Sequence, residues 1–343
     1  MKSKNLFKMG WGAFRGRFRG QRIPLNVMLS VTNRCNSKCN YCNIPTRNQR
    51  ELTTREVFDL IDQAVKTGAQ RLGLWGGEPL IRDDIGLIID YAKNKGLYVT
   101  LDSNGHLIEE RFRLLRNLDH LILALDGTEE MHDRNRGKGS FQKAMKAARC
   151  LRGKIPTWTI TVLTKHNLGG IDFILEVARN NGFLATFQVL HHNEILGGSR
   201  ESLLPPDDSY RKAIREIIIK KKNGAPVAST FRYLEHLLNW PDYKSPTLTY
   251  SINGLKCWAG RLYCNVDTDG SIYPCSLLVE KTKSLNYLDA GFKKAFDYIQ
   301  DVPCRSCDAS CFTEYNYLCS LNLFTIVEWI KAMRISRRYL YAR

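Results

Sequence analysis

Residues 35–42 have the sequence CNSKCNYC, so three cysteines stand within eight residues. The preceding residues 25–31 form a short run rich in apolar residues, which predicts a buried β-strand. The helix that follows is predicted to begin after Thr53, because Thr53 and Glu56 have capping-box spacing, and to end at Gly68. A three-cysteine loop therefore lies between a strand and the helix after it.

The same succession of strand and helix repeats along the first half of the chain. Runs rich in β-branched and aromatic residues predict six strands, near residues 25–31, 71–75, 97–101, 119–125, 157–163 and 184–190. Each run is followed by a turn and an amphipathic helix, which favours parallel pairing of the strands. Two architectures fit, a six-stranded incomplete barrel and a doubly wound sheet. Both place functional residues at the carboxyl ends of the strands.

The second half of the chain departs from this pattern. Helices are predicted at 207–222 and near 230–239, and the sequence beyond residue 256 is rich in cysteine as far as Cys319. We therefore expect five parts: a basic aromatic N-terminal segment (1–24), a partial barrel (25–204), a helical linker (205–250), a small cysteine-rich domain (251–320) and a basic amphipathic C-terminal helix (321–343).

Composition narrows the class of protein. The chain has 343 residues, of which 43% are hydrophobic and 25% charged, and this excludes a disordered or fibrous protein. The basic N-terminus is not followed by an apolar run of signal-peptide length, and residues 321–335 are too short and too charged to span a bilayer. We therefore expect a cytoplasmic protein, in which closely spaced cysteines bind metal rather than form disulfides.

The three cysteines of the first loop point to a metal cluster. Thiolates of Cys35, Cys39 and Cys42 can hold three irons of a [4Fe–4S] cube and leave the fourth iron open for another ligand. The alternative is a zinc site, which usually needs a fourth protein ligand, and no histidine lies nearby in the sequence. The spacing and its place after the first strand favour the cluster.

Four motifs in order resemble the radical S-adenosylmethionine (radical SAM) superfamily. They are CNSKCNYC after the first strand, Gly76-Gly77-Glu78-Pro79 after the second, Ser103-Asn104-Gly105 after the third and Leu125-Asp126-Gly127 after the fourth. The resemblance covers residues 25–320 and implies an α/β fold, a partial (β/α)6 barrel. It also implies that the open iron chelates S-adenosylmethionine, whose reductive cleavage gives a 5′-deoxyadenosyl radical that abstracts hydrogen from a substrate.

This resemblance implies a set of cofactor-binding residues: Tyr41, Gly76, Gly77, Glu78, Pro79, Ser103, Asn104, Asp126 and Arg136. Adjacent glycines let backbone groups approach the cofactor closely, although an ordinary tight turn explains them as well. For Glu78 two roles remain open, a contact to the methionine ammonium and bracing of its own loop. We expect Arg136 to grip the cofactor carboxylate with two hydrogen bonds, the alternative being a solvated arginine.

The cysteine-rich C-terminal region is similar to the SPASM extension of radical SAM enzymes, which binds auxiliary iron–sulfur clusters. Its expected ligands are Cys257, Cys264, Cys275, Cys304, Cys307, Cys311 and Cys319. Seven thiolates are one short of the eight that two fully ligated clusters need, so we expect one or two auxiliary clusters. A pair of zinc ribbons is the alternative. Of His191 and His192 at the end of the sixth strand, at most one can face the cavity.

The resemblance also implies partners. The substrate expected first is a peptide or protein that is crosslinked, epimerised or otherwise matured, with electrons supplied by a flavodoxin or ferredoxin. Where sulfatase-maturing relatives carry an acidic residue, this chain has Ser276, which argues against that activity. Only 34 residues precede Cys35, so a leader peptide would need a separate binding protein.

The net charge of +17 is concentrated at the two ends of the chain. Residues 1–22 carry seven basic side chains and residues 331–343 carry five, neither has an acidic one, and both lie among aromatic or apolar residues. Such segments suit an anionic membrane surface, so a peripheral membrane enzyme acting on a lipid or isoprenoid is the alternative. A zinc- or cluster-containing nucleic-acid-binding protein is the rival of another class, but it leaves the glycine and cysteine loops unexplained.

Overall fold

The structure is a computed structural model, which describes residues 3–191, 201–299 and 302–341, with side chains from 5 to 337. Its centre is a parallel sheet of six strands: β1 Asn26–Thr32, β2 Arg71–Gly76, β3 Tyr98–Ser103, β4 His120–Ala124, β5 Thr157–Leu163 and β6 Leu184–Val189. Neighbours in the sheet follow the order of the sequence from β1 to β6. A doubly wound sheet would reverse that order, so the structure confirms the partial (β/α)6 barrel.

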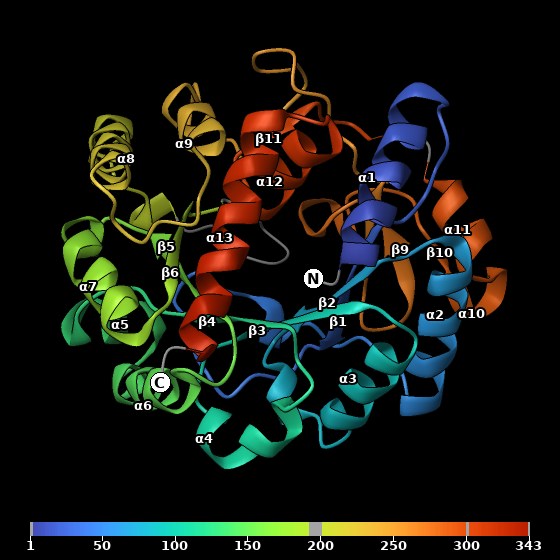
Figure 1. Cartoon of the computed structure of the whole chain (residues 1–343), viewed down its shortest axis with the longest axis horizontal. Helices are drawn as coiled ribbons and strands as arrows, with labels where there is room; N and C mark the ends of the chain where they lie inside the picture. Colours follow the sequence, from blue (N-terminus) through green and yellow to red (C-terminus); the bar gives the residue numbers. More distant parts are fainter. Residues whose placement is uncertain (1–2, 192–200, 300–301, 342–343) are drawn as a thin grey trace.

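Helices between the strands form the outer layer (Figure 1). They are α2 Thr54–Thr67, α3 Ile85–Asn94, α4 Ile108–Arg111, α5 Glu129–Arg136, α6 Ser140–Leu151 and α7 Ile171–Asn181. The predicted limits of α2 hold, because Thr53 and Glu56 form a reciprocal capping box and Gly68 ends the helix with a φ of 112°. The face of α2 that carries Val57 and Leu60 is buried against the sheet core.

The segment from 205 to 250 is not the linker that the sequence predicted. It contains α8 Asp207–Lys222 and α9 Phe231–Leu238, at almost the expected positions. However, Tyr210, Tyr233 and Trp240 are fully buried in the same core as the barrel strands. The hydroxyl of Tyr210 donates a hydrogen bond of 2.9 Å to the carbonyl of Leu163. Large aromatic side chains make this segment part of the barrel body.

The cysteine-rich region continues the central sheet. Strand β8 Tyr263–Val266 pairs in parallel with β1, and β9 Ser271–Tyr273 and β10 Leu285–Asn286 extend the sheet as antiparallel strands. Its other elements are α10 Tyr287–Ala290, α11 Phe292–Tyr298, the two-stranded sheet of β7 Thr247–Leu248 with β11 Ser306–Cys307, and α12 Ser310–Cys319. The cysteine-rich region therefore joins the barrel sheet at the edge formed by β1.

Both ends of the chain are helical and pack on the body. Helix α13 Leu323–Tyr341 crosses in front of the barrel strands (Figure 1), and its Trp329 and Ala332 pack against Trp158 of β5. The indole of Trp158 also donates a hydrogen bond of 2.7 Å to the Ser336 hydroxyl. None of the helices in the described parts of the chain is long and apolar enough to cross a membrane.

Helix α1 Ser3–Phe18 is held by close backbone contact. A Cβ at Gly12 or at Gly16 would lie 2.4 Å from a methyl group of Leu25 or Leu262, so both glycines let the helix lie against the barrel. After the helix, Arg22 donates hydrogen bonds to the carbonyls of three residues of the C-terminal region. The N-terminal segment is therefore a packed part of the fold.

Candidate active site at the carboxyl end of the barrel

The cysteine loop lies at the carboxyl end of β1, and its sulfurs receive hydrogen bonds. The backbone N–H of Ser37 donates to Sγ of Cys35 at 3.4 Å, and the amide of Asn104 donates to the same sulfur at 3.7 Å. Burial raises the pKa of Cys42 to about 11. Hydrogen bonds to sulfur are a standard feature of thiolates that hold an iron–sulfur cluster. Three such thiols on one loop fit a cluster with one open iron.

The glycine loop packs against the cysteine loop. The N–H of Gly77 donates to the carbonyl of Thr32 at 2.7 Å, and the N–H of Glu78 donates to the carbonyl of Arg34 at 2.9 Å. A Cβ at Gly77 would lie 2.2 Å from the Arg34 carbonyl oxygen, and Gly76 has a φ of 129°. The two glycines are thus required by contact between the loops, while their contact with the cofactor stays a prediction.

Substituting Gly77 by alanine should displace the cysteine loop, because the Arg34 carbonyl cannot avoid the new methyl group. We expect the variant to retain less iron than wild type after anaerobic reconstitution and to melt at a lower temperature. Gly10→Ala is the matched control, since a Cβ at this helical position meets nothing within 4 Å. Equal iron content in both variants would show that the loop contact does not position the cysteines.

Glu78 braces the loops that follow β2 and β3. Its carboxylate is fully buried and accepts hydrogen bonds from the backbone N–H of Leu80 at 3.2 Å, the hydroxyl of Ser103 at 3.0 Å and the backbone N–H of Asn104 at 2.7 Å. Burial raises its pKa to about 7. Pro79 begins the short 3-10 helix Pro79–Ile81. Of the two roles left open for Glu78, the structure places it in loop bracing.

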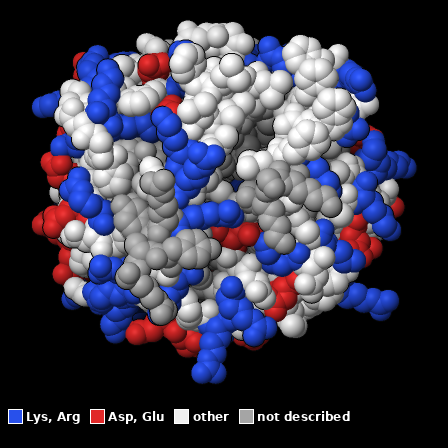
Figure 2. Space-filling model, in the orientation of Figure 1, with Lys and Arg blue, Asp and Glu red and all other residues white. Residues whose placement is uncertain are grey.

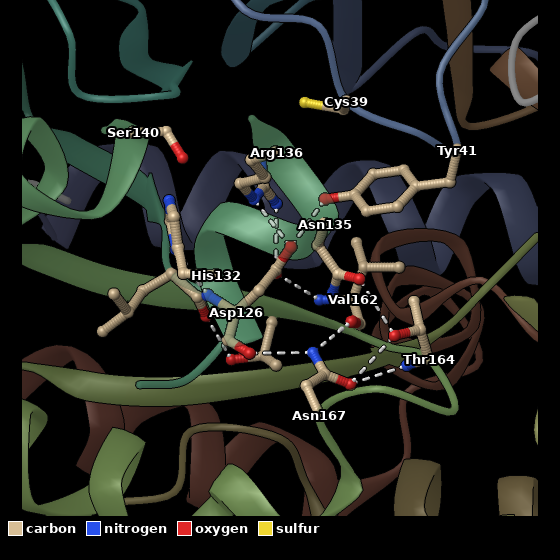
Figure 3. Close-up of polar contacts among 12 residues, drawn as sticks. Cys39, Tyr41, Asp126, His132, Asn135, Arg136, Ser140, Val162, Thr164 and Asn167 are labelled. Carbon is tan, nitrogen blue, oxygen red and sulfur yellow. Dashed lines mark hydrogen bonds and ion pairs between the residues drawn. The ribbon is translucent and has the colours of Figure 1, made fainter. Parts of the chain in front are cut away.

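Asp126 is the centre of a buried network (Figure 3). Arg136 donates to both of its carboxylate oxygens, at 2.7 and 3.2 Å, and Tyr41 and the N–H of Val162 donate to it at 2.8 and 3.0 Å. Arg136 therefore grips Asp126 with two hydrogen bonds, and its contact with the cofactor carboxylate stays a prediction. Through Arg136 and Tyr41, Asp126 ties α5 and the cysteine loop to the end of β4. A sequence motif alone does not reveal these contacts.

A cavity of about 360 Å³ occupies the inside of the barrel. One end reaches the cysteine loop at Tyr41 and Cys42, and Ser276 of the C-terminal region also contributes to its wall. The opposite end is lined by Tyr98, Trp158, Trp329 and Met333 together with Arg71 and His120. Helices α12 and α13 thus complete the wall that six strands leave incomplete.

A histidine that the sequence predicted as a possible cavity residue and an aspartate that it did not predict meet at this cavity. His191, just after β6, lines the cavity, and its Nδ1 lies 2.9 Å from Oδ1 of the fully buried Asp308. Asp308 directly follows Cys307, and that neighbour could have marked it as a candidate. His192 lies outside the described residues.

Five of the seven C-terminal cysteines lie together, and the other two lie at separate places. Five of them share one apolar environment: Cys257, Cys275, Cys304, Cys307 and Cys319. Burial raises the pKa of the last four, and the nearby Cys257 thiol raises it further in each case. Cys264 instead faces the main barrel core, and Cys311 lines the barrel cavity, so the structure does not bring these two expected ligands into the group. Among the residues described, no three His, Cys, Asp or Glu side chains are arranged to hold a single metal ion.

Comparison with known proteins agrees with this geometry. Residues 29–178 match the model of the Radical SAM superfamily, a segment that runs from β1 to α7 and contains the cysteine and glycine loops. Residues 29–178 are a radical SAM domain, and the chain that carries it is an enzyme. Its cofactors are S-adenosylmethionine and a [4Fe–4S] cluster, and its C-terminal cysteines fit an auxiliary cluster domain. Cys35, Cys39 and Cys42 stay the predicted ligands of that cluster.

Solved structures with the same fold extend the match beyond the barrel of this radical SAM enzyme. Streptococcus suis SuiB bound to S-adenosylmethionine has a TM-score of 0.66 and 17% identity, and the alignment covers 85% of this chain and 69% of SuiB. SuiB bound to its precursor peptide SuiA has a TM-score of 0.66 and 16% identity, with 85% and 68% covered. The structure of anSMEcpe with bound AdoMet and Cp18Cys peptide has a TM-score of 0.63 and 18% identity, with 89% and 99% covered.

Proposed function

We propose that this radical SAM enzyme modifies a peptide or protein. The observation that carries the proposal is Asn265 of β8, which is fully buried in the cavity wall and whose amide nitrogen and oxygen have no hydrogen-bond partner among the described residues. A side-chain amide with one donor and one acceptor to offer is complementary to a peptide group. Leaving such a group unpaired costs about 1–3 kcal/mol, which a bound amide would recover.

Two similar structures support the same substrate class. SuiB is seen with the peptide SuiA and anSMEcpe with the peptide Cp18Cys, and the alignments cover 85% and 89% of this chain. We propose that the cofactor lies between the glycine loop and Asn104, above this cavity. When bound and reduced, S-adenosylmethionine supplies the 5′-deoxyadenosyl radical that abstracts hydrogen. The chain's own contribution is to position the substrate and exclude water from the radical.

The test is to incubate the reconstituted enzyme anaerobically with short peptides encoded beside its gene, together with S-adenosylmethionine and reductant. We expect one peptide to change in mass, by losing hydrogen or by gaining deuterium in heavy water. Asn265→Leu should weaken binding of that peptide about tenfold, because two hydrogen bonds of about 0.5–1.5 kcal/mol each are lost. If 5′-deoxyadenosine forms at the same rate with and without every peptide, and none changes in mass, the peptide proposal fails.

A membrane-associated enzyme is the second candidate, and the surface of α1 favours it. Phe7 and Phe18 are 74% and 62% exposed, and Trp11 is also exposed, on a helix with basic residues in its last turn. Figure 2 shows basic side chains spread over this face beside an uncharged, hollowed area. Exposed aromatics next to basic groups suit the surface of an anionic bilayer.

Removing residues 1–22 would not test the membrane candidate cleanly, because α1 and Arg22 pack on the barrel. The variant Phe7→Ser/Phe18→Ser keeps those contacts. If the membrane candidate is right, its co-sedimentation with phosphatidylglycerol vesicles falls tenfold or more, since burying one phenylalanine contributes about 1.5–3 kcal/mol. Leu87→Ser on α3, 61% exposed, is the matched control. Equal sedimentation of wild type and both variants would exclude α1 as a membrane contact.

A further inference from the structure

Cys311 is separated from the cysteines around it. It lies at the start of α12, three residues after Asp308, and its side chain is exposed to the barrel cavity. The five other cysteines in the C-terminal apolar cluster are already enough for one [4Fe–4S] cluster, which needs four thiolates. Burial raises the pKa of the Cys311 thiol, the charge of Asp102 on β3 raises it further, and the charge of Arg71 on β2 lowers it.

The wall around Cys311 is built to hold a polar ligand. Asn265 and the hydroxyl of Tyr315 are more than nine-tenths buried, line the same cavity and have no hydrogen-bond partner within the described ranges. The Arg71 guanidinium lies 5.2 Å above the ring of Tyr315 and donates to Thr100 at 2.8 Å. Buried polar groups without partners are rare in folded proteins and indicate a binding site.

We propose that Cys311 is a free thiol of the reaction cavity, not a cluster ligand, and that it returns a hydrogen atom to the substrate radical. The hydrogen-donor role of Cys311 depends on the proposed function only for the class of substrate. In the step, the Sγ–H bond breaks and a C–H bond forms at the carbon from which hydrogen was abstracted. The resulting thiyl radical would take one electron from an external one-electron donor of the flavodoxin or ferredoxin class and one proton from solvent, which restores the thiol. The net reaction then leaves the substrate at its original oxidation state.

The placement of the thiol is tested without any substrate. The iron-loaded enzyme is treated anaerobically with iodoacetamide, and the labelled cysteines are identified by peptide mass spectrometry. We expect Cys311 to be alkylated, although more slowly than the half-buried Cys150 on α6 because burial raises the pKa of its thiol, while Cys319 is protected. Protection of Cys311 equal to that of Cys319, lifted only after the iron is chelated, would overturn the proposal.

Iron content gives the second readout. Cys311→Ser should keep the wild-type iron content, as should the control Cys150→Ser, whereas Cys319→Ser should lose iron. If Cys311→Ser loses as much iron as Cys319→Ser, Cys311 is a ligand and the proposal is wrong. Neither measurement involves a peptide, so failure here is distinguishable from failure of the peptide proposal.

Hydrogen return is tested with S-adenosylmethionine alone in heavy water. The thiol exchanges to S–D, so uncoupled cofactor cleavage should give 5′-deoxyadenosine that carries one deuterium. We expect Cys311→Ala to lower the deuterated fraction to that of the medium background, and the control Cys150→Ala to leave it high. If deuterium persists in Cys311→Ala and disappears in Tyr315→Phe, the hydrogen donor is Tyr315 and not Cys311.

Discussion

Cys39→Ala loses one complete four-iron cluster and all formation of 5′-deoxyadenosine. Cys35, Cys39 and Cys42 are the predicted protein ligands of the cluster with the open iron, and two thiolates cannot hold the cube. Wild type should contain about eight to twelve irons per chain, depending on whether one or two auxiliary clusters form, and the variant about four fewer. Iron analysis measures the iron content of wild type and variant. The electron paramagnetic resonance spectrum of the reduced protein shows whether the four-iron cluster is lost.

The control for Cys39→Ala is Cys264→Ala, which removes a cysteine that faces the barrel core instead of a ligand. Its iron content should equal that of wild type. A variant of Cys39 that keeps every iron would contradict the assignment of the loop, even if its activity were lost.

Asp126→Ala should destabilise the protein by about 3–5 kcal/mol, because it leaves the Arg136 guanidinium buried without its counter-charge. The side chain of Asp126 is fully buried, and four hydrogen bonds to it are lost together. The urea midpoint of the metal-free chain measures the loss, and we expect it to fall without a change in the slope of the transition.

Two further variants separate charge burial from simple loss of contacts at Asp126. Tyr41→Phe removes one neutral donor and should cost about 1 kcal/mol. The double variant Asp126→Leu/Arg136→Met replaces the buried ion pair by apolar side chains and should recover much of the stability lost in Asp126→Ala. If the double variant is less stable than the single one, the unpaired arginine is not the reason for the loss.

The barrel could be predicted from the sequence because its signals are local. The first four strands are each followed within a few residues by a turn motif, helices come between the strands, and six repeats of one pattern leave few folds. The cysteine loop was predicted for the same reason, since all three thiols lie in one short segment.

The remaining features of the fold and of the site depend on contacts between distant parts of the chain. Pairing of β8 with β1 and burial of Tyr210 beside β5 join segments whose sequences give no sign of each other. The expected ligand Cys264 shows what a finer argument could have found. It lies in a strand between Tyr263 and Asn265, and alternation along the strand turns Cys264 to the face opposite that of Asn265.

The sequence could not predict which carboxylate Arg136 binds. Its chemistry suits a carboxylate, which the sequence predicted, but two carboxylates compete for it. The structure shows that Arg136 donates to the carboxylate of Asp126, ten residues earlier. Only the fold decides which of them lies within reach.

The formation of 5′-deoxyadenosine by the wild-type enzyme tests the central claim most directly. The protein is reconstituted with iron and sulfide without oxygen, supplied with S-adenosylmethionine and dithionite, and the products are separated by liquid chromatography. A radical SAM enzyme yields 5′-deoxyadenosine and methionine in equal amounts, and neither forms with Cys39→Ala. A protein that binds zinc tightly, takes up no iron and leaves S-adenosylmethionine intact would contradict the account.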